Sequence, residues 1–112
     1  MGLSIERSDG ILIAMAEGRV DGTNAQEFQG ALTDAIDPAD RAVILDLGQI
    51  TYISSAGLRV ILLTARALKR QDAELAVCSL SAAIREVFEI SGFDKIIPVR
   101  ESRPDAIASF KA

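Results

Sequence analysis

The stretch that decides the fold is AVILDLGQITYISSAGLRVIL, residues 42–62. Its first six residues form a nearly unbroken apolar run, which is typical of a central strand buried on both faces. After a short connection, residues 56–70 have the apolar spacing of a helix. The inward positions of this helix are Leu58, Ile61, Leu62, Ala65 and Leu68. The stretch therefore predicts a buried strand that leads through two serines into an amphipathic helix.

A hairpin and a helix are expected before this stretch. Apolar residues alternate with period two on either side of Asp9-Gly10, and an Asp-Gly pair supplies the positive φ angles of a tight turn. Helical spacing begins after Thr23 and Asn24. Either residue can cap this helix, because each is followed three positions later by Gln or Glu. Pro38 lies just past the expected helix end.

Strands and helices alternate after the central stretch. Residues 74–78 read as a second buried strand, and residues 81–91 as a helix stopped by a glycine. Residues 96–99 predict a short edge strand, since the proline within them cannot donate to a ladder. A last helix is expected from about Pro104. The order predicts a single α/β domain, residues 1–112, with an N-terminal hairpin, a mixed β-sheet and about four helices packed against it.

Composition excludes several classes of function. The 112 residues contain no histidine and one cysteine, so neither a Ser–His–Asp or Cys–His nucleophile nor an imidazole or thiolate zinc site can be built. No Walker loop or dinucleotide glycine fingerprint is present. The chain is therefore predicted to be no enzyme and to need no cofactor or metal. Its net charge of −4 argues against nucleic-acid binding, which requires a basic face.

The sequence also predicts a location. The N-terminal residues are acidic where a signal peptide needs basic ones, and no apolar run approaches the ~18 residues of a membrane span. The single cysteine, Cys78, fits a reducing compartment. Its place in a buried strand indicates a small core residue. A cytoplasmic protein without direct membrane insertion is expected.

Ser54 and Ser55 lie where the connection enters the second helix. Either hydroxyl can serve as an N-cap by accepting a hydrogen bond from an orphan amide of the first turn. The same geometry tolerates a phosphate, because a helix start offers unpaired amides and the positive end of the macrodipole. Phosphorylation would add about −1.5 to −2 charges there. One site can therefore act as a structural cap and as a switch.

Residues 52–62, YISSAGLRVIL, resemble the signature of the anti-sigma factor antagonists, the freestanding bacterial members of the STAS (sulfate transporter and anti-sigma factor antagonist) family. The resemblance covers essentially the whole chain. It includes the opening hairpin, the turn at residues 18–21, the strand at residues 43–47 and the segment at residues 90–93. It implies a STAS-like fold and a regulatory function in transcription.

The resemblance also implies a partner-switching cycle. In that family a serine two residues before the motif glycine is phosphorylated by a kinase that doubles as the anti-sigma factor. That serine is Ser55 here, two before Gly57. A PP2C-type phosphatase reverses the modification, and the unphosphorylated antagonist binds the kinase and frees the sigma factor. Many members carry Asp directly before the phospho-acceptor, where this chain has Ser54, so Ser54 is the alternative modification site.

Further residues are predicted to bind the partner. Arginines and one leucine follow the outer side of the second helix at i, i+4, i+7 and i+11: Arg59, Leu63, Arg66 and Arg70. Such a stripe is either an ordinary solvated face or a docking surface of arginines around an exposed leucine. By the resemblance, Asp21 and Asn24 lie beside the phospho-acceptor, and helix capping explains them equally well. The predicted partner-binding set is Asp21, Asn24, Ser54, Ser55, Gly57, Arg59, Leu63 and Arg66.

Two alternatives remain open at this level. Asp46, at the end of the central strand, either bonds backbone amides of the following loop or helps to place a kinase-bound metal. The chain as a whole is alternatively a STAS-type accessory subunit of a membrane transporter, which would bind an ATPase subunit without a phosphorylation cycle. The motif serine favours the antagonist.

Overall fold

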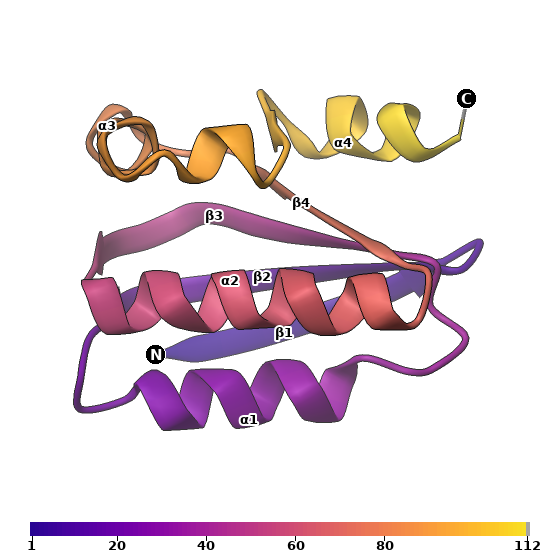
Figure 1. Ribbon diagram of the computed structural model, residues 1–112, viewed down its shortest axis with the longest axis horizontal. Helices are drawn as coiled ribbons and strands as arrows, with labels where there is room; N and C mark the ends of the chain where they lie inside the picture. Colours follow the sequence, from indigo (N-terminus) through magenta and orange to yellow (C-terminus); the bar gives the residue numbers. More distant parts are fainter. Residues whose placement is uncertain (112) are drawn as a thin grey trace.

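One five-stranded mixed sheet forms the centre of the computed structural model, which describes residues 1–111 (Figure 1). The strands are β1 Gly2–Ser8, β2 Ile11–Val20, β3 Ala42–Ile53, β4 Glu74–Cys78 and β5 Val99–Arg100. The helices are α1 Ala25–Ala35, α2 Ser55–Arg70, α3 Ala82–Ser91 and α4 Arg103–Phe110, with a short 3₁₀ helix, η1, at Phe93–Lys95. β1 pairs antiparallel with β2, and all other neighbours in the order β1-β2-β3-β4-β5 are parallel. The predicted α/β fold is confirmed.

The turn between β1 and β2 has the predicted backbone conformation. Asp9 and Gly10 have φ angles of 55° and 77°, so both residues are in the left-handed region that a type I′ turn requires. The Arg41 guanidinium donates to the Asp9 carbonyl from Nη2 at 3.0 Å. This contact joins the turn to the start of β3.

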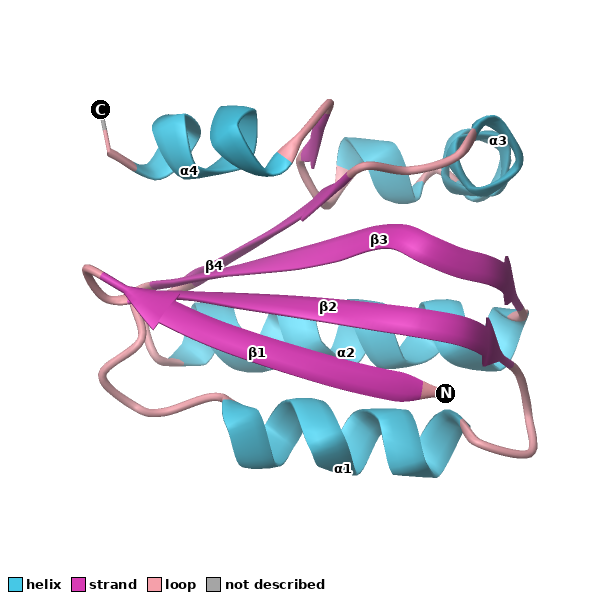
Figure 2. Ribbon diagram, turned by 180° about the vertical axis from the view of Figure 1, so that it is seen from behind, coloured by secondary structure: helices cyan, strands magenta, loops and turns pink. Residues whose placement is uncertain are grey.

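The helices divide between the two faces of the sheet. α1 and α2 lie side by side along one face, and α4 covers the other (Figures 1 and 2). The larger core includes the fully buried Phe28 of α1, Ile61 of α2 and Phe88 of α3. The smaller core packs Ala106 of α4 onto Ile44 and other residues of the opposite face. Because the central strands are covered on both faces, they read as apolar runs in the sequence.

Two ion pairs attach peripheral elements to this frame. Asp40, in the loop between α1 and β3, is buried and accepts from Arg7 of β1 at 2.7 Å, and this hydrogen bond lowers the pKa of the carboxyl. Asp46 accepts from Arg103 Nε of α4 at 2.6 Å and from the Gly48 amide at 2.8 Å. The structural interpretation of Asp46 is therefore supported, since both oxygens are occupied within the fold.

β3 is longer than the apolar run predicts. The sequence predicts a connection after Leu47, yet the strand continues to Ile53, with Ile50 and Ile53 buried. Irregularities in the pairing with β2 at Met15/Glu17 and Gly18/Arg19 shift the register along this extension. The shifts break the alternation of inward and outward residues, so the sequence carries no period-two signal there.

Two further local predictions were wrong. Asn24 occupies the N-cap position of α1, but its side chain makes no cap hydrogen bond and Thr23 does not replace it. The predicted short edge strand exists, but its bounds were wrong: it is β5, Val99–Arg100, and not residues 96–99. The Pro98 carbonyl still accepts from the Val77 amide at 3.0 Å. The proline therefore stands at the first bond of the ladder, where it needs no donor.

Candidate functional site

The two serines lie at the carboxyl end of the parallel strands. β2 and β3 end side by side at Val20 and Ile53, and the loops that leave them lead into α1 and α2 at the same end of the molecule (left in Figure 1). The Ser54 amide donates to the Val20 carbonyl at 2.9 Å, which fastens one loop to the other strand. Loops that gather at the carboxyl ends of parallel strands are the usual place for sites in α/β folds.

Ser54 and Ser55 have different roles in this geometry. Ser54 is the N-cap of α2: its backbone is extended, and its half-buried hydroxyl accepts from the Gly57 amide at 3.4 Å. Ser55 is the first helical residue, and its side chain is exposed and makes no hydrogen bond within residues 1–111. The capping hydroxyl is therefore occupied while its neighbour is available to a partner.

Gly57 allows the start of α2 to approach the sheet. A Cβ at this position would lie 2.7 Å from Ile53 Cγ1 and 2.8 Å from Val20 Cγ1, closer than real Cβ contacts. The glycine is buried between the ends of β2 and β3. It therefore acts by positioning the two serines, and its burial leaves it no contact surface for a partner.

The loop between β2 and α1 is braced by its own polar side chains. Asn24 Oδ1 accepts from the Asp21 amide at 2.9 Å, and Asn24 Nδ2 donates to the Arg19 carbonyl at 2.8 Å. Asp21 in turn accepts from the hydroxyl and the amide of Thr23, which lowers the pKa of its carboxyl. Asp21 and Asn24 thus shape the loop beside the serines.

An exposed aromatic residue, which the sequence analysis did not single out, borders the same end. The Arg19 guanidinium lies 4.3 Å from the centre of the Tyr52 ring. The Tyr52 side chain is 42% exposed, and the residue lies one position before the end of β3. Tyr and Arg are enriched where proteins bind one another. The pair forms only because Arg19 and Tyr52 are opposite one another across β2 and β3, a register set by the irregular pairing.

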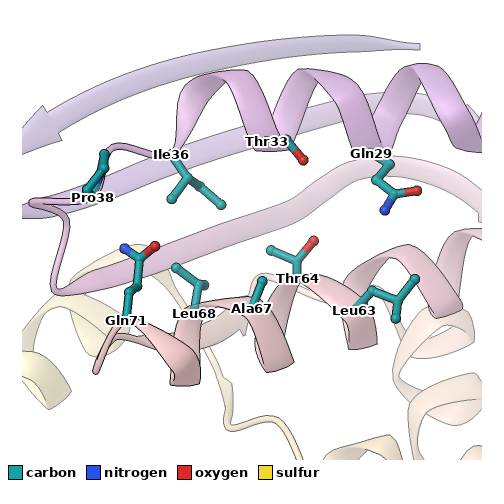
Figure 3. Close-up of a pocket in the computed structure, with 9 residues that line it drawn as sticks. All are labelled: Gln29, Thr33, Ile36, Pro38, Leu63, Thr64, Ala67, Leu68 and Gln71. Carbon is teal, nitrogen blue, oxygen red and sulfur yellow. The ribbon is translucent and has the colours of Figure 1, made fainter.

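The outer face of α2 carries the predicted basic stripe. Arg59, Arg66 and Arg70 are exposed, and none makes an ion pair within residues 1–111. Leu63 was expected to be exposed among them, but it is half-buried, because it lines a groove between α1 and α2 (Figure 3). The predicted site thus divides into a serine end, formed with Asp21 and Asn24, and this basic face about one to four turns away.

Three other features of residues 1–111 bear on function. Cys78 is fully buried, as predicted, and burial raises the pKa of its thiol. No cluster of three or more potential metal-binding side chains is found in this range. None of the helices there has the length and hydrophobicity that a membrane crossing requires.

Comparison with known proteins gives a consistent result. The model of the STAS domain matches residues 3–106. The candidate anti-sigma factor antagonist BtrV of Bordetella bronchiseptica is 49% identical over 111 residues, which cover 99% of this chain and 96% of that protein.

Solved structures agree in fold. The crystal structure of an anti-sigma factor antagonist from Mycobacterium paratuberculosis matches with a TM-score of 0.90 at 22% identity, covering 99% of this chain and 94% of that one. The antagonist SpoIIAA matches in its unphosphorylated form with a TM-score of 0.81 at 18% identity, covering 98% and 96%. The phosphorylated form of the Bacillus protein SpoIIAA matches with a TM-score of 0.73 at 18% identity, covering 97% and 99%. With a family match over nearly its whole length, the chain belongs to the STAS domain family.

Proposed function

We propose that this protein is an anti-sigma factor antagonist that binds an anti-sigma factor with serine kinase activity and releases it on phosphorylation of Ser55. A PP2C-type phosphatase would restore the binding form. The relative with 49% identity supports the antagonist function, because its alignment covers nearly the whole of both chains. The observation that carries the choice of residue is the division between a capping Ser54 and a free, exposed Ser55.

A phosphate on Ser55 would change binding more than folding. The first turn of α2 contains no acidic residue, and its unpaired amides and positive dipole end accommodate an anion. In a complex the same dianion would have to lose its hydration within the interface. An unpaired buried charge costs several kcal/mol, and about 1.4 kcal/mol already lowers affinity tenfold. The modified protein is therefore expected to stay folded and to dissociate.

The partner surface around Ser55 follows from the described geometry. Asp21 and Asn24 hold the neighbouring loop, Ser54 holds the helix start, and Arg59 extends the surface along α2. Tyr52 adds an exposed ring at the border. Contact with a kinase active site requires an accessible hydroxyl on a rigid support, and this arrangement supplies both.

Substitutions at the two serines test the proposal. Ser55→Ala should bind the purified anti-sigma factor kinase of the same bacterium with unchanged affinity and resist phosphorylation by it. Ser55→Asp should fold normally and bind at least tenfold more weakly. Ser54→Ala is the matched control, and it should still be phosphorylated while losing about 1 kcal/mol of stability with its cap. Calorimetry and mass spectrometry of the modified peptide measure these quantities.

Phosphate mapped to Ser54, or equal affinity of the two variants at position 55, would contradict the assignment. Selective binding to a transport ATPase instead of a kinase would favour the accessory-subunit alternative.

A further inference from the structure

A groove separates α1 and α2 on the outer surface of the molecule (Figure 3). It has a cavity volume of about 250 Å³ and is partly open to solvent. In Figure 3 the side chains of Thr33 on α1 and of Ile36, just after it, face those of Thr64 and Leu68 on α2. Leu63 on α2 and Gln71, the residue that follows α2, lie toward the two ends of the groove.

The groove has an uncharged lining, arginines along its α2 border, and one exposed acidic residue, Asp37, between the lining residues Ile36 and Pro38. Its lining residues are Gln29, Thr33, Ile36, Pro38, Leu63, Thr64, Ala67, Leu68 and Gln71. At 100° per residue, the acidic Glu27 and Asp34 of α1 lie roughly 100–120° around the helix from Thr33, away from the groove. The arginines of α2 lie beyond Leu63 on the outer side: Arg59 four residues before it, Arg66 three after it and Arg70 seven after it. Leu63 is therefore the boundary between an apolar channel and a basic stripe.

We propose that this groove binds an acidic amphipathic helix of the anti-sigma factor kinase, with apolar side chains in the groove and carboxylates against Arg59, Arg66 and Arg70. This inference rests on the proposed function and specifies the part of the partner that α2 recognises. Charge complementarity supports it, since α2 contains no acidic residue and its three outer arginines have no ion-pair partner within residues 1–111. Apolar anchors with complementary charges at the border are the usual mode of binding a helix in a groove.

The groove begins about two turns of α2 beyond the serine end. Ser55 and Leu63 are eight residues apart on one helix, which corresponds to about 12 Å along its axis. From Leu63 to Gln71 the groove extends for roughly another 12 Å. That length accommodates two anchors at i and i+4 or i and i+7 of a partner helix. One partner can therefore cover Ser55 and fill the groove together.

Cross-linking from inside the groove identifies its occupant. Ala67 lines the groove with an exposed side chain, so Ala67→Cys can carry a photo-activated cross-linker without disturbing the core. The native Cys78 is fully buried and will not be labelled. With the purified anti-sigma factor kinase of the same bacterium, the cross-linked peptide should be acidic, with apolar residues at the expected spacing. Ala83→Cys, exposed on α3, is the control and should give no cross-link.

An affinity measurement separates this inference from the proposed function. Ala67→Glu should weaken kinase binding at least tenfold, whereas Ala83→Glu should leave it unchanged. If Ser55→Asp abolishes binding while Ala67→Glu binds like the unmodified protein, the groove inference is wrong and the antagonist function stands. A cross-link to a basic segment, or none from position 67, would likewise overturn it. If the unmodified chain does not bind the kinase at all, the proposed function fails.

Discussion

At position 57 the absence of a side chain lets the start of α2, with its two serines, lie close to the sheet. Gly57→Ala would bring a methyl group within 2.8 Å of two buried side chains, Val20 and Ile53. Both belong to the ends of the parallel strands, so relief requires the start of α2 to move. We expect the free energy of unfolding to fall by about 1–3 kcal/mol, as for other overpacked sites. Urea denaturation measures this change.

Gly30 provides the matched control. It also lies within a helix, α1, but a Cβ there meets no atom within 4 Å. Gly30→Ala should therefore stabilise the protein by about 0.5–1 kcal/mol through reduced entropy of the unfolded chain. Equal effects at positions 57 and 30 would show that close packing at the serine end is not what requires Gly57.

At the scale of elements, α4 is the separable part of the fold. It covers the smaller core, where Ala106 packs with Cys78 and strand residues. Ala106→Asp would place a charge in this contact and undock the helix, while the larger core on the opposite face remains intact. The buried thiol then becomes exposed, so its reaction with a thiol reagent should accelerate at least tenfold with little loss of circular dichroism.

The control for this change lies two residues away. Ala108 is exposed on the same helix, and Ala108→Asp makes the same chemical change without touching the core. Its thiol reactivity should match that of the unmodified protein. If both variants leave Cys78 unreactive, the thiol is protected by the strands alone and α4 is not its cover.

The elements also show how far local pattern predicts structure. Local pattern predicts the start of β3 and the helix α2 correctly. Residues 42–47 form a nearly unbroken apolar run, and the apolar residues of α2 recur with the spacing of a helix. The extension of β3 to Ile53 has no such pattern, because the register shifts in its pairing with β2 interrupt the alternation of inward and outward side chains. Asn24 has the residue type of a cap, but its amide group bonds the preceding loop instead. Tertiary contacts decide both cases.

At the scale of the whole molecule, the site combines local and long-range features. The pair Ser54 and Ser55 is visible in the sequence, because a helix start and its cap are set within a few residues. The Arg19–Tyr52 contact and the groove beside Leu63 are not, because they depend on strand register and on the spacing of two helices. Leu63 was predicted to be an exposed contact, and the structure places it instead at the boundary of a groove.

Charge is also distributed unevenly over the molecule. The net charge is −4, yet α2 carries Arg59, Arg66, Lys69 and Arg70 without an acidic residue. An acidic partner would be attracted to this helix, whereas the rest of the chain is net acidic. The electric field of this charge distribution orients the approaching partner and raises the association rate by tenfold or more at low salt. At 0.1 M salt the field is screened within about 10 Å.

Reversing two charges tests this field while keeping the fold. Arg59→Glu combined with Arg66→Glu should slow association with the anti-sigma factor kinase about tenfold or more at low salt and flatten its salt dependence. Exposed charges contribute little to stability, so circular dichroism and the unfolding midpoint should stay unchanged.

Lys95→Glu combined with Arg100→Glu makes the same change in net charge at exposed positions in η1 and β5. Stopped-flow association rates should drop only for the α2 pair, because the location of the charge decides the steering. An equal drop for both pairs would mean that net charge alone governs the encounter, and no drop for the α2 pair would mean that its stripe is an ordinary solvated face.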